Sequence, residues 1–273
     1  MMKKIRLDVL LVERNLIDTR EKAKRTIMAG LVYSNQERMD KPGIKVDPEI
    51  PLYIKQNLHP YVSRGGLKLE KALKEFSIDV KNLILIDVGS STGGFTDCAL
   101  QNGAKMSYAI DVGYNQLDWK LRSDDRVIVM ERTNFRYVTS DMLKKGTPNL
   151  ATVDVSFISL TLILPVLKTL LDKNSEVVIL IKPQFEAGRH QVGKGGIIRD
   201  PKIHLEVIEN ILKFAKEEKY NIVDLTYSPI TGGEGNIEYL AHLTWEKDDQ
   251  KNPIIDIQEV IDEAHESLQK KSS

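Results

Sequence analysis

Residues 83–94 read Leu-Ile-Leu-Ile-Asp-Val-Gly-Ser-Ser-Thr-Gly-Gly, an apolar run that ends in a glycine-rich turn. A short apolar run bounded by glycine is typical of a buried strand, and the glycines let the backbone turn tightly and approach a ligand closely. A phosphate-binding P-loop would continue with Gly-Lys-Ser/Thr, which does not follow here. Ser91 also stands where the dinucleotide-binding pattern has the glycine that admits a pyrophosphate. The turn therefore counts against NAD and favours a cofactor without phosphate, such as S-adenosylmethionine.

Two polar residues farther along the chain support a cofactor site at this turn. Asp111 ends the next apolar stretch, where an acid commonly binds the two ribose hydroxyls of a nucleoside. Asn134 follows the third apolar stretch, where it either binds an adenine edge or forms an ordinary turn. We predict S-adenosylmethionine as the cofactor, bound by Asp87, Gly89, Ser90, Ser91, Thr92, Gly93, Gly94, Asp111, Val112, Asn134 and Asp154.

Strands and helices alternate through most of the chain. Apolar stretches typical of strands cover 83–88, 106–112, 126–130, 150–155, 176–182, 221–228 and 237–244. Helical patterns cover 66–76, 93–102, 115–122, 159–173 and 201–218. This alternation predicts an α/β fold with a doubly wound, mainly parallel sheet. The glycine-rich link 231–236 predicts that the last two strands form an antiparallel pair, so we expect a Rossmann-like seven-stranded methyltransferase sheet.

The first 60 residues predict a separate, small α+β unit. Thr19 is a good helix N-cap, Gly30 a good C-cap, and Asn35 is typical of a turn between strands. Residues 1–75 contain 16 Lys and Arg against 10 Asp and Glu, although the whole chain has 39 of each. A basic end on a neutral chain indicates either a module that binds a polyanion or a solvated helical face.

Composition limits the remaining possibilities. We expect a small domain over 1–60, a larger catalytic domain over 61–250 and an amphipathic C-terminal helix within 251–273. The single cysteine, Cys98, permits no internal disulfide, and the five histidines show no metal-ligand spacing, so we predict no structural metal. The N-terminus has no signal-peptide pattern, and no apolar run reaches the roughly 20 residues of a membrane helix. We therefore expect a cytoplasmic protein that does not enter a membrane.

Four charged residues lie beside the predicted strands and at the start of a predicted helix. They are Lys68, Asp154, Lys182 and Glu238. Taken singly, each is readily explained as a lysine with a buried stem or an acid in an ion pair. Open α/β sheets bind their ligands at the carboxyl ends of the strands. As a set beside a cofactor turn, the four residues therefore predict a catalytic site.

These motifs carry a resemblance to known families. The segment containing Arg6-Leu7-Asp8, Thr19-Arg20 and Gly30 resembles the small RNA-binding domain first seen in ribosomal protein S-four. From Arg6 to about Trp245 the chain resembles the TlyA family, whose catalytic domain is similar to that of FtsJ. The specific matches are the four charged residues and the motifs at 153–160, 182–189 and 192–200. TlyA proteins are ribose 2′-O-methyltransferases that use S-adenosylmethionine and act on ribosomal RNA.

The resemblance implies a role for each residue of the set. Lys182 is the expected base, Lys68 steers the hydroxyl and its phosphate, Asp154 orients Lys182, and Glu238 positions the lysines. The implied substrate is a cytidine ribose, and the implied partner is ribosomal RNA or a ribosomal subunit; the oligomeric state stays open. The basic, glycine-rich loop 188–200 is either a flap that contacts RNA or a solvated loop. We expect RNA contacts, residue by residue, from Arg6, Arg20, Lys24, Arg25, Arg64, Arg189 and Lys194.

Three other functions compete with this interpretation. A non-catalytic RNA-binding or ribosome-assembly factor would not need the four charged residues. A cytolysin would fit the haemolysin label that much of the family carries, but it needs an amphipathic membrane segment that the sequence does not show. A pseudouridine synthase can share the N-terminal domain, but it does not need a glycine turn paired with Asp111.

Overall fold

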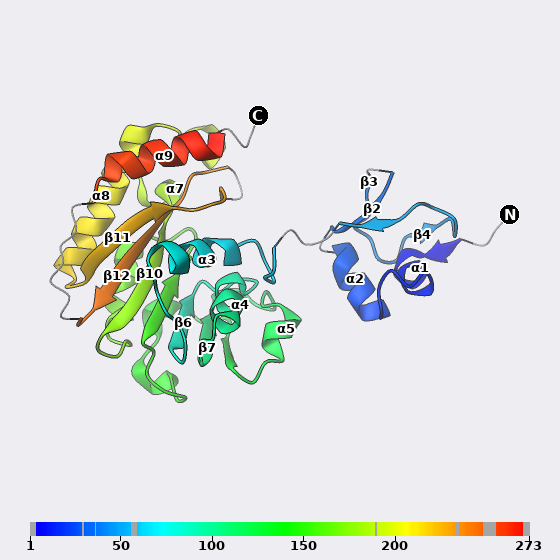
Figure 1. Cartoon of the computed structure of the whole chain (residues 1–273), viewed down its shortest axis with the longest axis horizontal. Coiled ribbons are helices and arrows are strands. Elements are labelled where there is room, and N and C mark those ends of the chain that lie inside the picture. The colour runs from blue at the N-terminus through cyan, green and yellow to red at the C-terminus, as the bar shows by residue number, and fades with distance from the viewer. Residues whose placement is uncertain are drawn as a thin grey trace. The chain divides into compact units, whose positions relative to one another are not determined.

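The chain forms two compact units, Met1–Pro60 and Tyr61–Ser273, which are coloured from blue to red along the chain in Figure 1. The computed structural model describes residues 4–28, 30–35, 37–55, 59–188, 190–232, 235–247 and 255–269. The C-terminal helix belongs to the second unit, where it packs against the longest helix and an edge strand of the sheet. None of the helices in these described ranges is both long and apolar enough to span a membrane.

The N-terminal unit is built from two helices and two small antiparallel sheets, β1–β4 and β3–β2–β5. The backbone N–H of Lys22 donates to Thr19 Oγ1 at 3.2 Å, and Gly30 has φ of 70°. Both predicted helix caps are therefore confirmed, and Asn35 with φ of 47° forms the predicted turn. The elements are β1 (Ile5–Arg6), α1 (Leu7–Glu13), α2 (Arg20–Met28), β2 (Val32–Ser34), β3 (Glu37–Arg38), β4 (Lys45–Val46) and β5 (Tyr53–Ile54).

The second unit is organised around one seven-stranded sheet, as the alternation of the sequence predicts. Five strands are parallel, and β12 lies antiparallel between β10 and β11. The antiparallel pairing of the last two strands is thus confirmed, and β12 is inserted into the sheet rather than added at its edge. In spatial order the strands are β11 (Asn221–Tyr227), β12 (Tyr239–Trp245), β10 (Ser175–Ile181), β9 (Leu150–Val153), β6 (Ile84–Val88), β7 (Met106–Ile110) and β8 (Val127–Met130).

Helices cover both faces of this sheet, which explains why its strands are almost continuously apolar. One face packs against α3 (Gly66–Glu75), α4 (Gly94–Gln101) and α5 (Trp119–Arg122) through residues such as Leu69, Phe95 and Leu121. The other packs against α6 (Leu164–Leu167), α8 (Pro201–Glu217) and α9 (Ile257–Gln269). The remaining short elements are η1 (Phe135–Tyr137), η2 (Ser140–Met142), η3 (Leu160–Leu162), α7 (Pro183–Glu186) and η4 (Lys194–Gly196).

Two predicted helices are shorter than expected. The stretch 159–173 is not one helix but the two short pieces η3 and α6. Pro165 lacks an N–H and its ring clashes with the preceding turn, so it starts a helix rather than continuing one. The helix expected over 115–122 begins only at Trp119, because Asn115 is left-handed with φ of 56° and Asp118 supplies the N-cap.

Asp87, in the last part of β6, connects three elements behind the glycine turn. Its Oδ2 accepts from the N–H and the hydroxyl of Thr96 at 3.2 and 2.7 Å, and its Oδ1 accepts from the Thr152 hydroxyl at 2.8 Å. Its side chain has no solvent exposure. Burial raises the pKa of Asp87 to about 6, although the hydrogen bonds from Thr96 and Thr152 oppose the rise.

A pH-dependent stability follows from this buried carboxyl. The folded state binds the Asp87 proton more tightly than the unfolded state, so stability is lost as pH rises from about 4 through about 6. Asp87→Asn keeps an acceptor for Thr96 and a donor for Thr152 but cannot ionise. We expect wild type to lose on the order of 3 kcal/mol of unfolding free energy relative to this variant between about pH 4 and pH 7. Urea unfolding at both pH values measures it, and a pH-independent difference between the two proteins would contradict it.

Candidate active site

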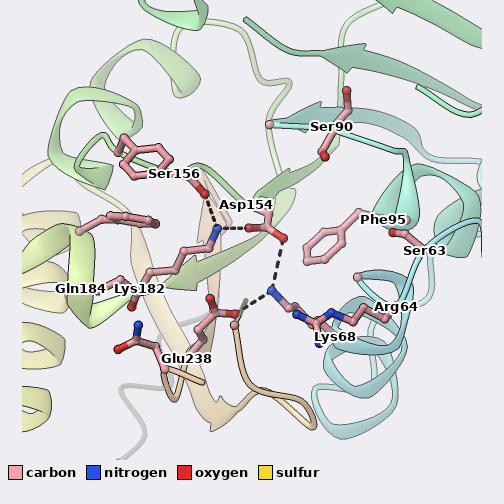
Figure 2. Close-up of a pocket in the computed structure, with 18 of the residues that line it drawn as sticks. Ser63, Arg64, Lys68, Ser90, Phe95, Asp154, Ser156, Lys182, Gln184 and Glu238 are labelled. Carbon is pink, nitrogen blue, oxygen red and sulfur yellow. Dashed lines mark hydrogen bonds and ion pairs between the residues drawn. The ribbon is translucent and has the colours of Figure 1, made fainter. Parts of the chain in front are cut away.

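The register of the sheet brings charged residues from distant parts of the chain to one edge. Asp154 follows β9 and Lys182 follows β10, so both lie at the carboxyl ends of neighbouring parallel strands. Glu238 comes just before β12, and the antiparallel pairing of Ile181 with Tyr239 places that start beside the end of β10. Lys68 comes from the first turn of α3. The four side chains meet in a cavity of about 690 Å³ (Figure 2).

The four charged groups form a chain of alternating sign, shown by the dashed lines in Figure 2. Lys182 Nζ lies 2.5 Å from Asp154 Oδ1, and Asp154 Oδ2 lies 3.6 Å from Lys68 Nζ. Lys68 Nζ donates to Glu238 Oε2 at 2.7 Å. Lys182 Nζ also donates to the hydroxyl of Ser156 at 3.1 Å. Glu238 thus holds Lys68 directly, whereas Asp154 bridges the two lysines.

Pairing keeps the central members of this chain ionised, although Lys68 is buried and Asp154 is partly buried. Burial by itself would lower the pKa of Lys68, but the charges of Asp154 and Glu238 outweigh it and raise that pKa. Burial would likewise raise the pKa of Asp154, but Lys68 and Lys182 overcome it and lower that pKa. Lys68 is therefore a permanent cation and Asp154 a permanent anion near neutral pH.

A second cavity, of about 330 Å³, lies along the loops that follow β6, β7 and β8. Asp111 is fixed at its wall, because its Oδ2 accepts from the N–H of Ser91 at 2.8 Å and its Oδ1 from that of Gly113 at 2.7 Å. Asn134 Oδ1 accepts from the N–H of Arg136 at 3.2 Å, which makes Asn134 the cap of η1 as well as a lining residue. The apolar walls are provided by Val112, Phe135, Ile158 and Ile163.

This second cavity fits a nucleoside cofactor. A carboxylate for ribose hydroxyls, an amide and apolar walls for a purine are the groups that such a ligand needs. Gly89, with φ of 83°, lets the glycine turn lie close to the backbone of Asp154, because a Cβ there would collide with the carbonyl oxygen of Asp154. The two cavities share five lining residues, so a ligand in one meets a ligand in the other beside Asp154. The shared residues are Gly89, Ser91, Asp154, Ser156 and Phe157.

The predicted cofactor residues divide into three groups. Six of them line the second cavity: Gly89, Ser91, Asp111, Val112, Asn134 and Asp154. Ser90 and Gly94 line the cavity of the charged residues instead. Asp87, Thr92 and Gly93 line neither cavity, and they shape the turn from behind. The backbone carbonyl of Thr92 accepts from the N–H of Asp118 at 3.1 Å. Gly93, with φ of 97°, is the left-handed N-cap of α4.

The predicted RNA-binding residues also differ in their surroundings. Arg64 is exposed and lines the cavity of the charged residues, and Lys24 is exposed on α2. Arg6 and Arg20 share the buried Asp8, with Nε to carboxylate distances of 2.9 and 3.0 Å. Hydrogen bonds from Arg6, aided by Arg20, lower the pKa of Asp8 to about 2 against the effect of burial. Arg189 and the side chains of Arg25 and Lys194 lie outside the described residues.

Two residues at the site were not singled out from the sequence. Phe157 is 91% exposed at the border of both cavities, and its ring centroid lies 4.8 Å from that of Phe185. Glu186 accepts from the hydroxyl of Ser159 at 2.6 Å and from the N–H of Leu160 at 2.8 Å. It therefore ties the loop after β9 to the helix that follows Lys182. The sequence offered one signal for Phe157, because an aromatic residue directly follows Asp-Val-Ser at the end of a predicted strand. No local sequence pattern points to Glu186.

Comparison with known proteins supports the interpretation of this geometry. Residues 61–245 match the family of FtsJ-like methyltransferases, and residues 5–49 match the S4 domain. The chain belongs to the FtsJ-like methyltransferase family. S-adenosylmethionine is accordingly the cofactor expected in the second cavity, whose residues fit it.

The similarity of this methyltransferase to individual proteins extends over both units. "Putative rRNA methyltransferase YqxC" of Bacillus subtilis is 63% identical, over 99% of this chain and 98% of that protein. The 16S/23S rRNA (cytidine-2′-O)-methyltransferase TlyA of Mycobacterium tuberculosis is 39% identical, over 91% of this chain and 92% of that protein. A solved structure described as "Putative hemolysin from Streptococcus thermophilus" is 52% identical, with a TM-score of 0.78 over 100% of this chain and 99% of the other.

Gly89 of this methyltransferase allows a direct test of the cofactor cavity. Gly89→Ala should weaken S-adenosylmethionine binding roughly 10- to 100-fold, because the new Cβ pushes Asp154 and the turn apart. Gly103→Ala is the matched control, since Gly103 also has a positive φ, of 96°, but a Cβ there meets only Lys81 at 3.6 Å or more. Calorimetric titration with the cofactor measures both variants. Equal affinities for the two would show that the close approach at Gly89 does not shape the site.

Proposed function

We propose that this methyltransferase transfers the methyl group of S-adenosylmethionine to a ribose 2′-hydroxyl of ribosomal RNA. The observation that carries the proposal is the alternating chain of Lys182, Asp154, Lys68 and Glu238 directly beside the cofactor cavity. Two lysines held by two acids can position and deprotonate a neutral hydroxyl. The shared wall of the two cavities brings such a hydroxyl within reach of the methyl donor.

The chemistry explains why these residue types are needed. A ribose hydroxyl is a weak acid and a weak nucleophile, so it must be aligned with the methyl group and lose its proton as it attacks. The cofactor supplies an electrophilic methyl on a sulfonium; an O–C bond forms while the S–C bond breaks and its electron pair stays on sulfur. The hydroxyl proton passes to the lone pair of Lys182 Nζ, which must be the neutral amine when the oxygen attacks and which Asp154 orients. Lys68, held by Glu238, orients the hydroxyl and the neighbouring phosphate through its fixed positive charge.

The substrate class is supported by the relatives and by the N-terminal unit. The relative from Mycobacterium tuberculosis acts on cytidine in 16S and 23S rRNA, so we propose a cytidine of ribosomal RNA, free or in a ribosomal subunit, as the substrate. Residues 1–60 serve as the RNA-binding domain and 61–250 as the catalytic domain, with the segment 251–273 contributing a helix. The place of action is then the cytoplasm, where ribosomal RNA is found.

Phe157 suits the binding of a nucleobase. Its exposed ring, held against Phe185 at the border of the two cavities, offers an apolar face to a base whose ribose lies beside Lys182. Aromatic side chains commonly bind single bases in this way. The exposed Arg64 in the same cavity can contact the RNA backbone.

Replacing Lys182 tests the proposed base. Lys182→Ala should lower methyl transfer by at least about 100-fold while cofactor affinity stays unchanged, because Lys182 lines only the cavity of the charged residues. Transfer of labelled methyl to each ribosomal subunit and to naked ribosomal RNA measures it, with alkali-resistant linkages locating the modified ribose. Lys173→Ala, at an 80% exposed lysine, is the control. Activity retained in Lys182→Ala would exclude Lys182 as the base, and wild type inactive on every RNA despite cofactor binding would favour a non-catalytic RNA-binding factor.

Replacing Phe157 tests base binding. Removing an aromatic ring that stacks on a base weakens binding by about 1–3 kcal/mol, so Phe157→Ala should raise the KM for RNA on the order of 10-fold or more. Phe157→Tyr keeps the ring and should behave nearly as wild type. Steady-state kinetics with varied RNA concentration compare the three proteins. If both variants weakened RNA binding equally, the ring would not be the contact.

A further inference from the structure

Asn236 lies in the turn before β12, two residues from Glu238, and it is 2% exposed. Its amide makes two hydrogen bonds with the main chain of the loop 193–200. The N–H of Ile198 donates to Asn236 Oδ1 at 3.0 Å, and Asn236 Nδ2 donates to the carbonyl of Gly196 at 2.9 Å. One side chain therefore satisfies both a donor and an acceptor of a loop about 40 residues earlier in the chain.

A second contact holds the same loop from the other side of Glu238. The carbonyl of Ile198 can only accept, so His204 Nε2, 3.1 Å away, carries the proton and donates to it. His204 Nδ1 then accepts from the hydroxyl of Tyr239 at 2.7 Å. Burial lowers the pKa of His204 to about 4, so the ring is neutral and this arrangement persists near neutral pH. Residues 236 and 239, on either side of Glu238, are both linked to Ile198.

The turn before β12 also lies close to the carboxylate of Glu238. A Cβ at Gly232 would lie 2.6 Å from Glu238 Oε1, so the turn leaves that carboxylate little room. The N–H of Gly232 donates to the backbone carbonyl of Asn236 at 2.9 Å, which closes the turn. Gly195, Gly196 and Asn236 all line the cavity of the charged residues. The loop and the turn thus form one wall of that cavity, joined through the Asn236 amide.

We propose that Asn236 is a positioning residue for methyl transfer: it fixes the loop 193–200 against the turn that carries Glu238, and so sets the place of Lys68. The inference rests on the proposed function, because Lys68 matters only if a hydroxyl is positioned there. Glu238 reaches Lys68 at 2.7 Å, so a displacement of the turn passes directly to the lysine. Asn236 does not line the cofactor cavity. Its two side-chain hydrogen bonds go to Ile198 and Gly196 and not to a residue of the charged chain.

The first test removes the amide. Asn236→Ala should lower kcat roughly 10- to 100-fold, since a shift of about 1 Å in a positioning group can cost that much. Cofactor affinity should stay unchanged, because Asn236 does not line that cavity. Hydrogen exchange at the Ile198 amide should become faster, since its acceptor is gone. Asn221→Ala is the matched control, because Asn221 is an exposed residue that donates to the carbonyl of Lys247.

The second test separates the donor from the acceptor. Asn236→Asp keeps the oxygen that accepts from Ile198, but its ionised form has no hydrogen for the Gly196 carbonyl. Burial beside Glu238 favours the protonated acid, which donates again. The activity of Asn236→Asp relative to wild type should therefore rise several-fold as pH falls from about 8 to about 6. A structural defect would change cofactor affinity together with activity over the same pH range, whereas the positioning role leaves that affinity constant.

The outcomes distinguish the two proposals. Lower kcat in Asn236→Ala with unchanged cofactor affinity, faster exchange at Ile198 and a pH-dependent ratio for Asn236→Asp supports the positioning role. Unchanged kcat, or a loss shared equally by cofactor binding, overturns it, and the Asp variant decides the case if the Ala variant does not fold. Wild type that binds cofactor but methylates no ribosomal RNA overturns the proposed function instead, and exchange at Ile198 then reports only on the contact.

Discussion

The structure of the site depends on the alternation of charge along Lys182, Asp154, Lys68 and Glu238. Burying one unpaired charge is costly, and removing one partner of a buried pair leaves the other uncompensated. Each acid of the series faces at least one lysine, so the group can be withdrawn from bulk water while Lys68 and Asp154 stay ionised. The pKa directions of Lys68 and Asp154 follow from this pairing. The alternation explains why the four residues act as a set and why each was ambiguous when considered alone.

Sheet topology makes this pairing possible. Asp154 and Lys182 lie at the carboxyl ends of parallel strands, where any doubly wound sheet collects polar residues. Glu238 precedes its strand, and in a wholly parallel sheet it would lie at the opposite edge. The antiparallel insertion of β12 beside β10 reverses that direction and delivers the start of β12 to the end of β10. The antiparallel direction of β12 therefore determines where the Glu238 carboxylate lies.

The same edge joins two cavities at Asp154. Its carboxylate belongs to the chain of alternating charge, and its backbone carbonyl packs against Gly89 of the glycine turn. Supporting residues hold the loops around this junction. Asp87 holds the glycine turn, Glu186 of α7 holds the loop after β9, and Asn236 of the turn before β12 holds the loop before α8. Each uses a polar side chain to satisfy main-chain or hydroxyl groups of another element, so the loops beside the two cavities are fixed where regular structure ends.

The sequence by itself determined the strand and helix alternation, the glycine turn with Asp111, the caps at Thr19 and Gly30, and the membership of the charged set. The caps, the glycine turn and each strand or helix depend on spacing along one short segment, where local sterics and hydrogen bonding suffice. The charged set and Asp111 were recognised because each member lies at a predicted strand end or helix start. Only the tertiary structure showed that Asp87 faces away from both cavities, that Pro165 divides a predicted helix, and that Glu238 pairs with Lys68. It alone also revealed the contacts of Glu186 and Asn236. Those features depend on which atoms meet across tens of residues, and the partner of a polar side chain is decided by strand register and packing rather than by its neighbours in the chain.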